Sequence, residues 1–268
     1  MERLHFSCGF IDGEGGNRTV LALQAFQASR NLPVTGQPDA ATWQALNPGV
    51  PSLIKVKVTD EDFDSLCPVP SGWIEKSEAE TLGYNDIWEL LGERYHSKRA
   101  YLHALNPGEL SADDTIQVPN LSGMPPLAAA ARVRISLGDR TIEALDANGQ
   151  ILAHFPCSIA KDKDKRPSGQ LFVKVIAPHP NYTFDPKLFP DAAQLEGIHG
   201  RPIIPPGPRN PVGTVWIGLS LPTYGIHGTP EPENVSRTAS HGCFRLANWN
   251  AETLSKMVSI GTPIDVNP

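Results

Sequence analysis

The stretch 224–229, Tyr-Gly-Ile-His-Gly-Thr, and the stretch 240–246, Ser-His-Gly-Cys-Phe-Arg-Leu, decide the fold and the chemistry predicted for this chain. Cys243 carries a thiol that is strongly nucleophilic once deprotonated, and a nearby imidazole can lower its pKa or accept its proton. Gly242 leaves room for a substrate, because it has no Cβ. The pattern predicts a cysteine acyl-transfer site, with Cys243 as nucleophile, a histidine as base and backbone N–H groups around Cys243 as an oxyanion hole.

Three segments in the same order resemble the signature of the L,D-transpeptidases, the cell-wall enzymes of the YkuD type. The two stretches above match its His-Gly-Thr and Ser-His-Gly-Cys-x-Arg elements. Residues 204–217 are similar to its Pro-Gly-Pro-x-Asn-Pro-hydrophobic-Gly segment, and residues 166–169 to its Thr-Pro-x-Gly turn, with Arg166 replacing threonine. For residues 131–266 the resemblance implies a catalytic domain that is mostly β, a β-sandwich with few helices.

The apolar pattern of this part of the chain also indicates β structure. Short alternating segments are bounded by Gly- and Pro-rich turns, which predicts a compact, mostly β domain. One helix is predicted there, at 251–258. The predicted strands are 133–137, 141–145, 151–159, 171–176 and 213–219.

Residues 17–47 are predicted to form a small helical module. Helical periodicity begins at Thr19, the turn Leu-Pro-Val-Thr-Gly occupies 32–36, and a second helix is predicted at 39–46 with Asp39 as its N-cap. The pattern resembles the peptidoglycan-binding helical module found beside many wall enzymes. The alternative is a helical hairpin that only packs on its neighbour.

Residues 48–72 are predicted to be a connector with one strand at 53–58, and residues 73–120 to be rich in helix. The helix-helix-strand order of 73–120 resembles a divergent LysM glycan-binding module. Its usual Gly-Asp-Thr-Leu opening is replaced by Gly-Tyr-Asn-Asp-Ile at 83–87. The module is therefore expected either to bind glycan strands or to serve only as a spacer.

Charge and hydropathy exclude some classes of partner. The net charge of −6 argues against nucleic acid, because phosphate binding needs a concentrated basic surface. No segment approaches the length of apolar sequence that a membrane span requires. The N-terminus lacks the apolar stretch of a secretory signal. The resemblance nevertheless implies a place of action in the periplasm or cell wall, in peptidoglycan biosynthesis and cell shape, so export through a signal absent from this sequence is expected.

The four cysteines have different expected states. In an oxidising compartment Cys8, Cys67 and Cys157 allow a disulfide, and Cys8 with Cys67 is the pair we expect, although spacing does not determine pairing. Cys157 lies in an apolar stretch and is expected to be a small buried residue.

The resemblance assigns His227 as the general base that activates Cys243. Proton transfer requires hydrogen-bond reach between the two, and the other ring nitrogen needs an orienting acceptor. The resemblance implies that the backbone carbonyl of Gly228 is that acceptor. His241 either tunes the thiolate or bonds a loop carbonyl, and Ser240 is expected to brace the turn.

Two further residues are candidates for substrate binding. Arg245 can hold a carboxylate of the incoming peptide in its planar fork, or form a structural ion pair. Tyr224 can line the pocket and help to polarise the carbonyl, or lie in the core. A zinc site built from His199 and the motif residues is discounted, because the turn lacks metal-finger spacing and zinc would capture the thiolate.

The resemblance implies a direct crosslink between the third residues of two peptidoglycan stem peptides, formed through a thioester on the cysteine. No metal or organic cofactor is implied, and carbapenems are expected to acylate Cys243. An L,D-carboxypeptidase, which hydrolyses the same acyl-enzyme, and a non-catalytic wall-binding scaffold remain as alternatives.

Overall fold

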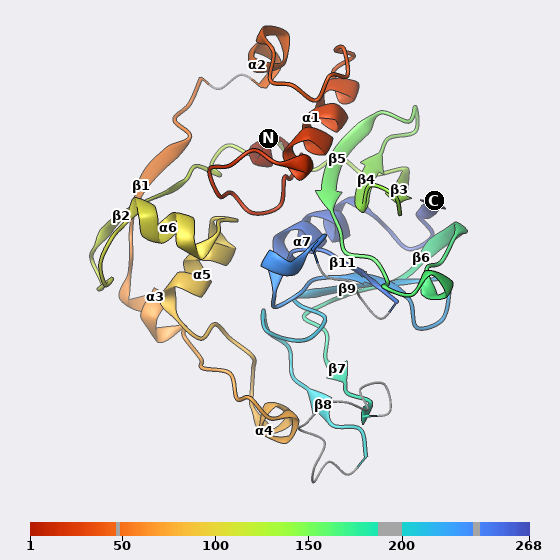
Figure 1. Cartoon of the computed structure of the whole chain (residues 1–268). Coiled ribbons are helices and arrows are strands. Elements are labelled where there is room, and N and C mark those ends of the chain that lie inside the picture. The colour runs from red at the N-terminus through yellow and green to blue at the C-terminus, as the bar shows by residue number, and fades with distance from the viewer. Residues whose placement is uncertain (47–48, 187–199, 238–241) are drawn as a thin grey trace.

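The computed structural model describes residues 1–46, 49–186, 200–237 and 242–268 (Figure 1). A helical N-terminal region, residues 1–119, lies beside a sheet domain that runs from residue 132 to the C-terminus. The sheet domain is mostly β with few helices, which confirms the fold class predicted from the sequence. The helices of the N-terminal region are η1 Glu2–Leu4, α1 Asn17–Ser29, α2 Ala40–Leu46, α3 Asp60–Asp64, α4 Trp73–Glu78, α5 Ile87–Arg94 and α6 Arg99–Leu105.

A buried glutamine explains why the chain turns back after α1. The Gln27 side chain is fully buried, and its amide nitrogen donates to the Gln37 carbonyl and the Thr42 hydroxyl, both at 2.9 Å. Its amide oxygen accepts from the backbone N–H groups of Thr35 (2.9 Å) and Gly36 (2.8 Å). One side chain therefore satisfies the polar groups of the turn between α1 and α2, as buried polar groups require.

The first residues of the chain pair with an edge strand of the sheet domain. The Ser7 N–H donates to the His154 carbonyl (2.8 Å), and the His154 N–H donates to the His5 carbonyl (2.9 Å). Beneath them Phe6 and Phe26 meet edge to face, with ring centroids 5.4 Å apart, in a core shared with the sheet domain. This contact covers an edge strand that would otherwise be open to pairing.

The strands β1 and β2 and the helices α5 and α6 share one small sheet and one core. β1 (Leu53–Lys57) pairs antiparallel with β2 (Thr115–Pro119), and α5 and α6 pack over the pair. The segment predicted as a connector thus supplies a strand of the same sheet as residues 115–119. It also contains α3, which was not predicted, because a five-residue helix is too short to show a period.

The expected disulfide between Cys8 and Cys67 is not formed, and all four cysteines are free thiols. Cys8 lies beside Thr19 at the start of α1, whereas Cys67 packs against Gly83 before α5. The two thiols belong to different parts of the helical region, so the prediction was wrong. Cys157 is fully buried, as predicted.

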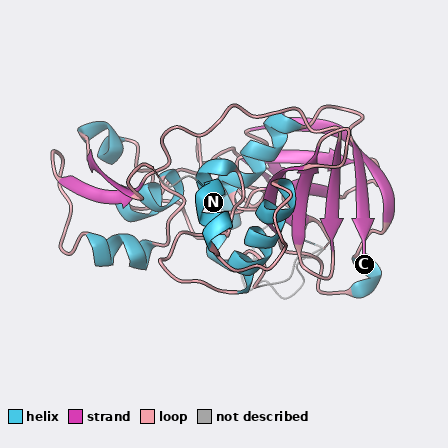
Figure 2. Ribbon diagram, turned by 90° about the horizontal axis from the view of Figure 1, so that it is seen from above, coloured by secondary structure: helices cyan, strands magenta, loops and turns pink. Residues whose placement is uncertain are grey.

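The sheet domain is built on one eight-stranded sheet in the order β11-β10-β9-β6-β12-β3-β4-β5. Figure 2 shows these strands gathered at one side of the molecule. Their bounds are β3 Arg132–Ser136, β4 Thr141–Leu145, β5 Ile151–Pro156, β6 Gly169–Pro178, β9 Val215–Leu219, β10 Gly225–His227, β11 Phe244–Arg245 and β12 Pro263–Asn267.

The long strand β6 joins the two halves of this sheet. Its residues 169–172 pair with β12, and its residues 173–178 pair with β9, with a register shift between Val173 and Val175. Such an irregularity bends a strand and increases its twist. Both halves consequently contribute to one hydrophobic core, in which Val173 is fully buried.

The helix α7 (Asn248–Met257) packs against β9 and β10. It begins three residues before the predicted start at 251, because Asn248 and Asn250 are buried and hydrogen-bonded in the fold. A separate hairpin, β7 (Tyr182–Thr183) with β8 (Ile203–Ile204), packs against α4. Two short 3-10 helices, η2 Lys163–Lys165 and η4 Pro232–Asn234, complete the elements of the described residues.

Candidate active site

The strand that ends at the predicted base, His227, pairs with the strand that directly follows the predicted nucleophile, Cys243. β10 and β11 run parallel, with Ile226 opposite Phe244 and His227 opposite Arg245. Side chains alternate between the faces of a strand, and neighbouring strands lie about 5 Å apart. Ile226 and Phe244 point into the core, where both are 1% exposed. Cys243 lies in the bend directly before β11, next to the strand that ends at His227.

His227 is buried and held in one tautomer. Its Nδ1 lies 2.6 Å from the carbonyl oxygen of Gly228. A carbonyl oxygen can only accept, so Nδ1 carries the proton and Nε2 remains an acceptor. Burial lowers the pKa of His227 to about 4, and the positive charge of Arg245 adds to this, against the hydrogen bond to Gly228. The ring is therefore neutral near pH 7 and able to take up a proton at Nε2.

Cys243 is half-buried beside two backbone groups. Its Sγ donates to the Thr223 carbonyl oxygen at 3.5 Å. Burial raises the pKa of the thiol, although the backbone N–H of Gly225 and the charge of Arg245 favour the thiolate. Of the two ways in which an imidazole can assist a thiol, these shifts favour acceptance of the proton during attack over a thiolate that exists beforehand.

The side chain of Trp216 covers the histidine. Trp216 stands opposite His227 in the register of β9 and β10, and the two rings stack with centroids 5.6 Å apart and an interplanar angle of 22°. The indole lies across Gly225 and Gly218, where added Cβ atoms would come within 2.6 and 2.9 Å of it. Sequence reasoning missed this residue. The available signal was the pair of glycines that face each other across β9 and β10.

Arg245 lies near the thiol, and Tyr224 lies against the glycine that precedes Cys243. Burial lowers the pKa of Arg245, while the negative charge of Glu231 and that of Cys243 raise it, so both groups lie near the guanidinium. The ring of Tyr224 lies against Gly242, with its Cε1 3.5 Å from the position of an added Cβ. Both predicted substrate-binding residues thus lie beside the Cys243 turn. Ser240, His241 and His199 fall outside the described residues.

Tyr182, which was not predicted as a site residue, lies within electrostatic range of the thiol. Burial raises the pKa of this phenol, and the charges of Cys243 and Asp185 act in the same direction. The residue comes from β7, 61 positions before the cysteine in the chain. No local sequence pattern reveals an interaction between residues so far apart in the chain.

Asn248 anchors the turn that follows His227. It is 1% exposed, its Nδ2 donates to the Pro208 carbonyl (3.1 Å), and its Oδ1 accepts from the Thr214 N–H (3.3 Å). The same oxygen lies against Gly213 and Gly228, where a methyl group would overlap it. The residue whose carbonyl orients His227 is therefore packed against Asn248 of α7, which is in turn bonded to the Pro-Gly-Pro segment.

The described part of the chain contains no group of three or more His, Cys, Asp and Glu side chains arranged to hold a metal ion. Among the helices described, none combines the length and apolar character needed to traverse a bilayer.

Two family models match the chain. Residues 130–266 match the YkuD model, described as "L,D-transpeptidase catalytic domain", and residues 2–46 match a model described as "Putative peptidoglycan binding domain". The second match begins earlier than the predicted helical module, and so includes the residues that pair with β5.

Relatives of known name are similar over the same part. A protein of Bacillus licheniformis named "Putative L,D-transpeptidase YkuD" is 25% identical over 175 residues, which is 64% of this chain and 87% of that protein. A solved L,D-transpeptidase from Mycobacterium smegmatis is 16% identical with a TM-score of 0.40, covering 60% of this chain and 76% of its own.

A further solved structure is described as an L,D-transpeptidase in complex with imipenem. It is 18% identical with a TM-score of 0.38, and the match covers 59% of this chain and 76% of that one. The YkuD match spans more than half of the 268 residues, and it coincides with the domain that holds His227 and Cys243. The chain belongs to the YkuD family of L,D-transpeptidase catalytic domains, with an N-terminal peptidoglycan-binding domain.

Proposed function

We propose that this protein crosslinks peptidoglycan by joining the third residues of two stem peptides through a thioester on Cys243. The observation that carries the proposal is the parallel pairing of β10, which ends at His227, with β11, which directly follows Cys243. The Gly228 carbonyl fixes the histidine tautomer in which Nε2 is free to accept a proton.

In the first half of the reaction, Nε2 of His227 takes the thiol proton as Sγ of Cys243 attacks the carbonyl between the third residue and D-Ala. Backbone N–H groups near Cys243 stabilise the developing oxyanion. The C–N bond breaks, the proton passes from His227 to the leaving amine, and D-Ala departs. The remaining stem is held as a thioester on Sγ.

In the second half, the side-chain amine of the third residue of another stem attacks the thioester. His227 accepts the proton that this amine loses, the C–S bond breaks, and the proton returns to the thiol. Arg245 is placed to hold a carboxylate of the peptide, since it lies near Cys243. Transfer of the acyl group to water instead would give an L,D-carboxypeptidase, which the product analysis below distinguishes.

We further propose that the N-terminal region keeps the enzyme on its polymeric substrate in the periplasm or cell wall. The match of residues 2–46 to a peptidoglycan-binding model supports this for the first module. Glycan binding by residues 73–120, as a LysM-like module, stays a prediction, as do the boundaries predicted for the modules.

The test is incubation of the full chain with purified peptidoglycan, followed by digestion and mass spectrometry of the muropeptides. We expect crosslinked dimers joined through third residues, absent with Cys243→Ser and reduced by about 10²–10⁴ in rate with His227→Gln. Cys67→Ser, which changes another half-buried thiol, is the matched control. Trimmed monomers without dimers would instead identify a carboxypeptidase, and dimers formed by Cys243→Ser would refute the mechanism.

Carbapenem inhibition provides an independent test of the nucleophile. The imipenem complex of a similar protein supports acylation of this one. We expect the intact mass to increase by one drug molecule on Cys243. An unchanged mass after prolonged exposure would contradict the proposed nucleophile.

A further inference from the structure

Residues 206–209, which precede the site, are clamped by the helical N-terminal region. The Leu82 N–H donates to the Pro206 carbonyl (2.9 Å), and the Arg209 N–H donates to the Leu82 carbonyl (3.2 Å). The backbone of Gly207 packs against Leu82 so closely that a Cβ would overlap it. A segment of the sheet domain is thus paired, in the manner of a short strand, with a loop of the helical region.

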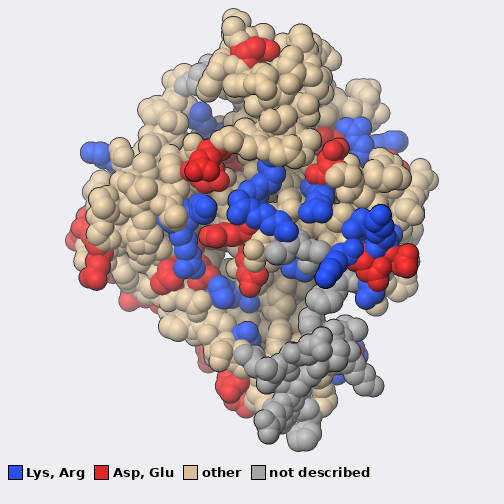
Figure 3. All heavy atoms as spheres, in the orientation of Figure 1, with Lys and Arg blue, Asp and Glu red and all other residues tan. Residues whose placement is uncertain are grey.

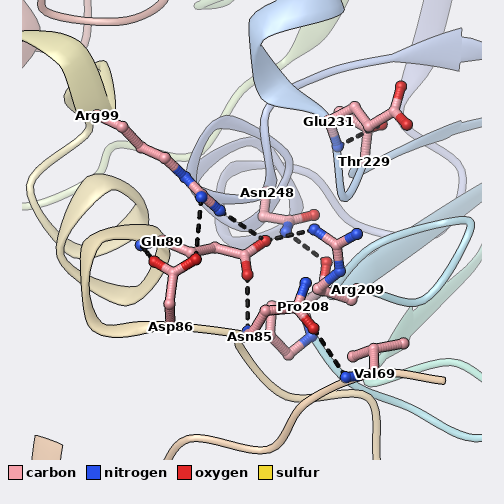
Figure 4. Close-up of polar contacts among 10 residues, drawn as sticks. All are labelled: Val69, Asn85, Asp86, Glu89, Arg99, Pro208, Arg209, Thr229, Glu231 and Asn248. Carbon is pink, nitrogen blue, oxygen red and sulfur yellow. Dashed lines mark hydrogen bonds and ion pairs between the residues drawn. The ribbon is translucent and has the colours of Figure 1, made fainter.

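An ion pair reinforces this clamp. The guanidinium of Arg209 bonds the carboxylate of Glu89 on α5 (Figure 4). The same carboxylate accepts from the Asn85 N–H at 2.7 Å and lies 3.4 Å from Nη2 of Arg99. Glu89 is largely shielded from water and held from three directions, so it offers Arg209 a fixed partner. Figure 3 shows acidic and basic side chains intermixed across the middle of this face.

Arg209 depends on Glu89 for its position. Its Nε is buried and has no hydrogen-bond partner among the described residues, while Nη1 bonds Glu89. Without the carboxylate, the charged group would be left partly buried and uncompensated, which is unfavourable. We expect it to turn toward water and to pull the backbone of 206–209 with it.

The other side of this segment leads to the histidine. The Pro208 carbonyl, next to Arg209, accepts from Nδ2 of Asn248, whose Oδ1 lies against Gly228. The Gly228 carbonyl accepts from Nδ1 of His227 at 2.6 Å. Prolines at 205, 206, 208 and 211 stiffen the segment, because each fixes one backbone angle. A continuous series of contacts therefore runs from α5 to the imidazole.

We propose that Glu89 and Arg209 are positioning residues through which the helical N-terminal region sets the orientation of His227. The inference rests on the proposed role of His227 as the base for Cys243. It gives the N-terminal region a part in the chemistry, in addition to any attachment to the wall. Misplacement of a base by a fraction of an ångström lowers the rate of proton transfer, so loss of the pair is expected to slow the reaction.

The test uses a small thiol reagent, so it does not depend on the identity of the substrate. The full chain is treated with iodoacetamide, and the alkylation rate of Cys243 is followed by peptide mass spectrometry, which separates it from the other cysteines. We expect Glu89→Gln to slow alkylation at pH 7 about 5-fold or more, the usual lower range of coupling between sites. His227→Gln gives the rate without the base.

Two comparisons separate positioning from general damage. Asp86→Asn is the matched control: Asp86 lies on the same turn and pairs with Arg99, but does not touch Arg209. Asparagine can still cap α5. We expect this variant to react as the wild type does. The double variant Glu89→Gln with Arg209→Gln is expected to be no slower than either single variant, because one interaction is lost in all three.

Several outcomes would overturn the inference. A folded Glu89→Gln protein, by circular dichroism, with a wild-type alkylation rate refutes it, and so does an equal loss in Asp86→Asn. If the wild type makes no crosslinks but its Cys243 alkylation still falls with Glu89→Gln, the proposed function fails and the coupling to His227 stands. If the wild type forms crosslinks and the alkylation of Cys243 is insensitive to Glu89→Gln, the proposed function stands and the coupling to His227 fails.

Discussion

The turn that holds His227 and the contact between α5 and Arg209 stabilise polar groups in opposite ways. At the turn, neutral amides and carbonyls of Asn248 and Gly228 are buried and packed without space for a methyl group. At the contact, charged groups are partly shielded from water, with the Arg209 side chain 29% and the Glu89 side chain 11% exposed. Added volume is therefore costly at the first place, and loss of one charge at the second leaves its partly buried partner uncompensated.

The largest effect on stability is expected from Gly213→Ala, which adds volume to the neutral turn. Gly213 has φ of +65°, and its Cβ would overlap Asn248 and the Gly228 backbone. Conformational strain together with overpacking is expected to destabilise the sheet domain by about 2–5 kcal/mol. Chemical denaturation followed by tryptophan fluorescence measures the loss.

Gly149→Ala is the control for Gly213→Ala. Gly149 also has positive φ, +83°, but no atom lies within 4 Å of its added Cβ. Only the conformational part of the loss in stability, about 1–2 kcal/mol, is expected for Gly149→Ala. Equal losses in both variants would show that the turn near His227 is not tightly packed.

The length of a strand largely decided whether it could be predicted from the sequence. Alternation located β3, β4, β5, β6 and β9, because strands with a buried face show a period of two, but β12 was not predicted. β7, β8, β10 and β11 have two or three residues each and show no period. Their pairing depends on contacts between distant parts of the chain.

The candidate site was predictable only in part. The resemblance to the family motif predicted His227 as the base for Cys243 and the carbonyl of Gly228 as its orienting acceptor. Trp216 and Asn248 were missed, since their contacts follow from strand register and from the packing of α7. The pairing of Arg209 with Glu89 was equally invisible, because 120 residues separate the two.

The second largest effect is expected from substitution of Trp216, which covers His227, and it changes the pH dependence of Cys243 alkylation. The pKa of His227 is about 4 chiefly because the ring is buried, partly under Trp216. Trp216→Leu lets water reach the ring, so this pKa is expected to rise toward the ordinary value of about 6.5. At pH 5.5 the imidazole of the variant would then be mostly protonated. The ratio of the Cys243 alkylation rate at pH 5.5 to that at pH 8 should therefore be up to about tenfold lower in the variant than in the wild type.

Stability provides a second measurement on Trp216→Leu. A histidine with a depressed pKa binds fewer protons folded than unfolded, so it contributes stability above about pH 6.5 that is lost as the pH falls toward 4. The variant should show a weaker dependence across this window. Trp43→Leu changes a tryptophan that is 52% exposed and far from the site in sequence, and is the control. An unchanged pH midpoint of alkylation in Trp216→Leu would contradict the role given to the indole.

The smallest effect is expected at Asp62, a charged group inside the helical region. Its carboxylate pairs with Arg94 at 2.6 Å and accepts from the Thr59 N–H at 2.9 Å, closing a capping box on α3. Burial alone would raise the pKa of Asp62, but the hydrogen bonds from Arg94 and Thr59 outweigh it and lower the pKa. The carboxylate therefore contributes stability above about pH 4, which is lost as the pH falls below that value.

Two substitutions at Asp62 separate the ion pair from the cap. Asp62→Asn keeps an acceptor for the Thr59 N–H and is expected to cost less than about 1 kcal/mol, because the Arg94 side chain is 44% exposed. Asp62→Ala removes the cap as well and should cost about 1–2 kcal/mol. Thermal unfolding measures both. Neither should alter alkylation of Cys243, because Asp62 lies outside the contacts that join Glu89 to His227. A slower reaction in Asp62→Asn would mean that any change in the helical region reaches the site, and the specific coupling through Arg209 would then be lost as an explanation.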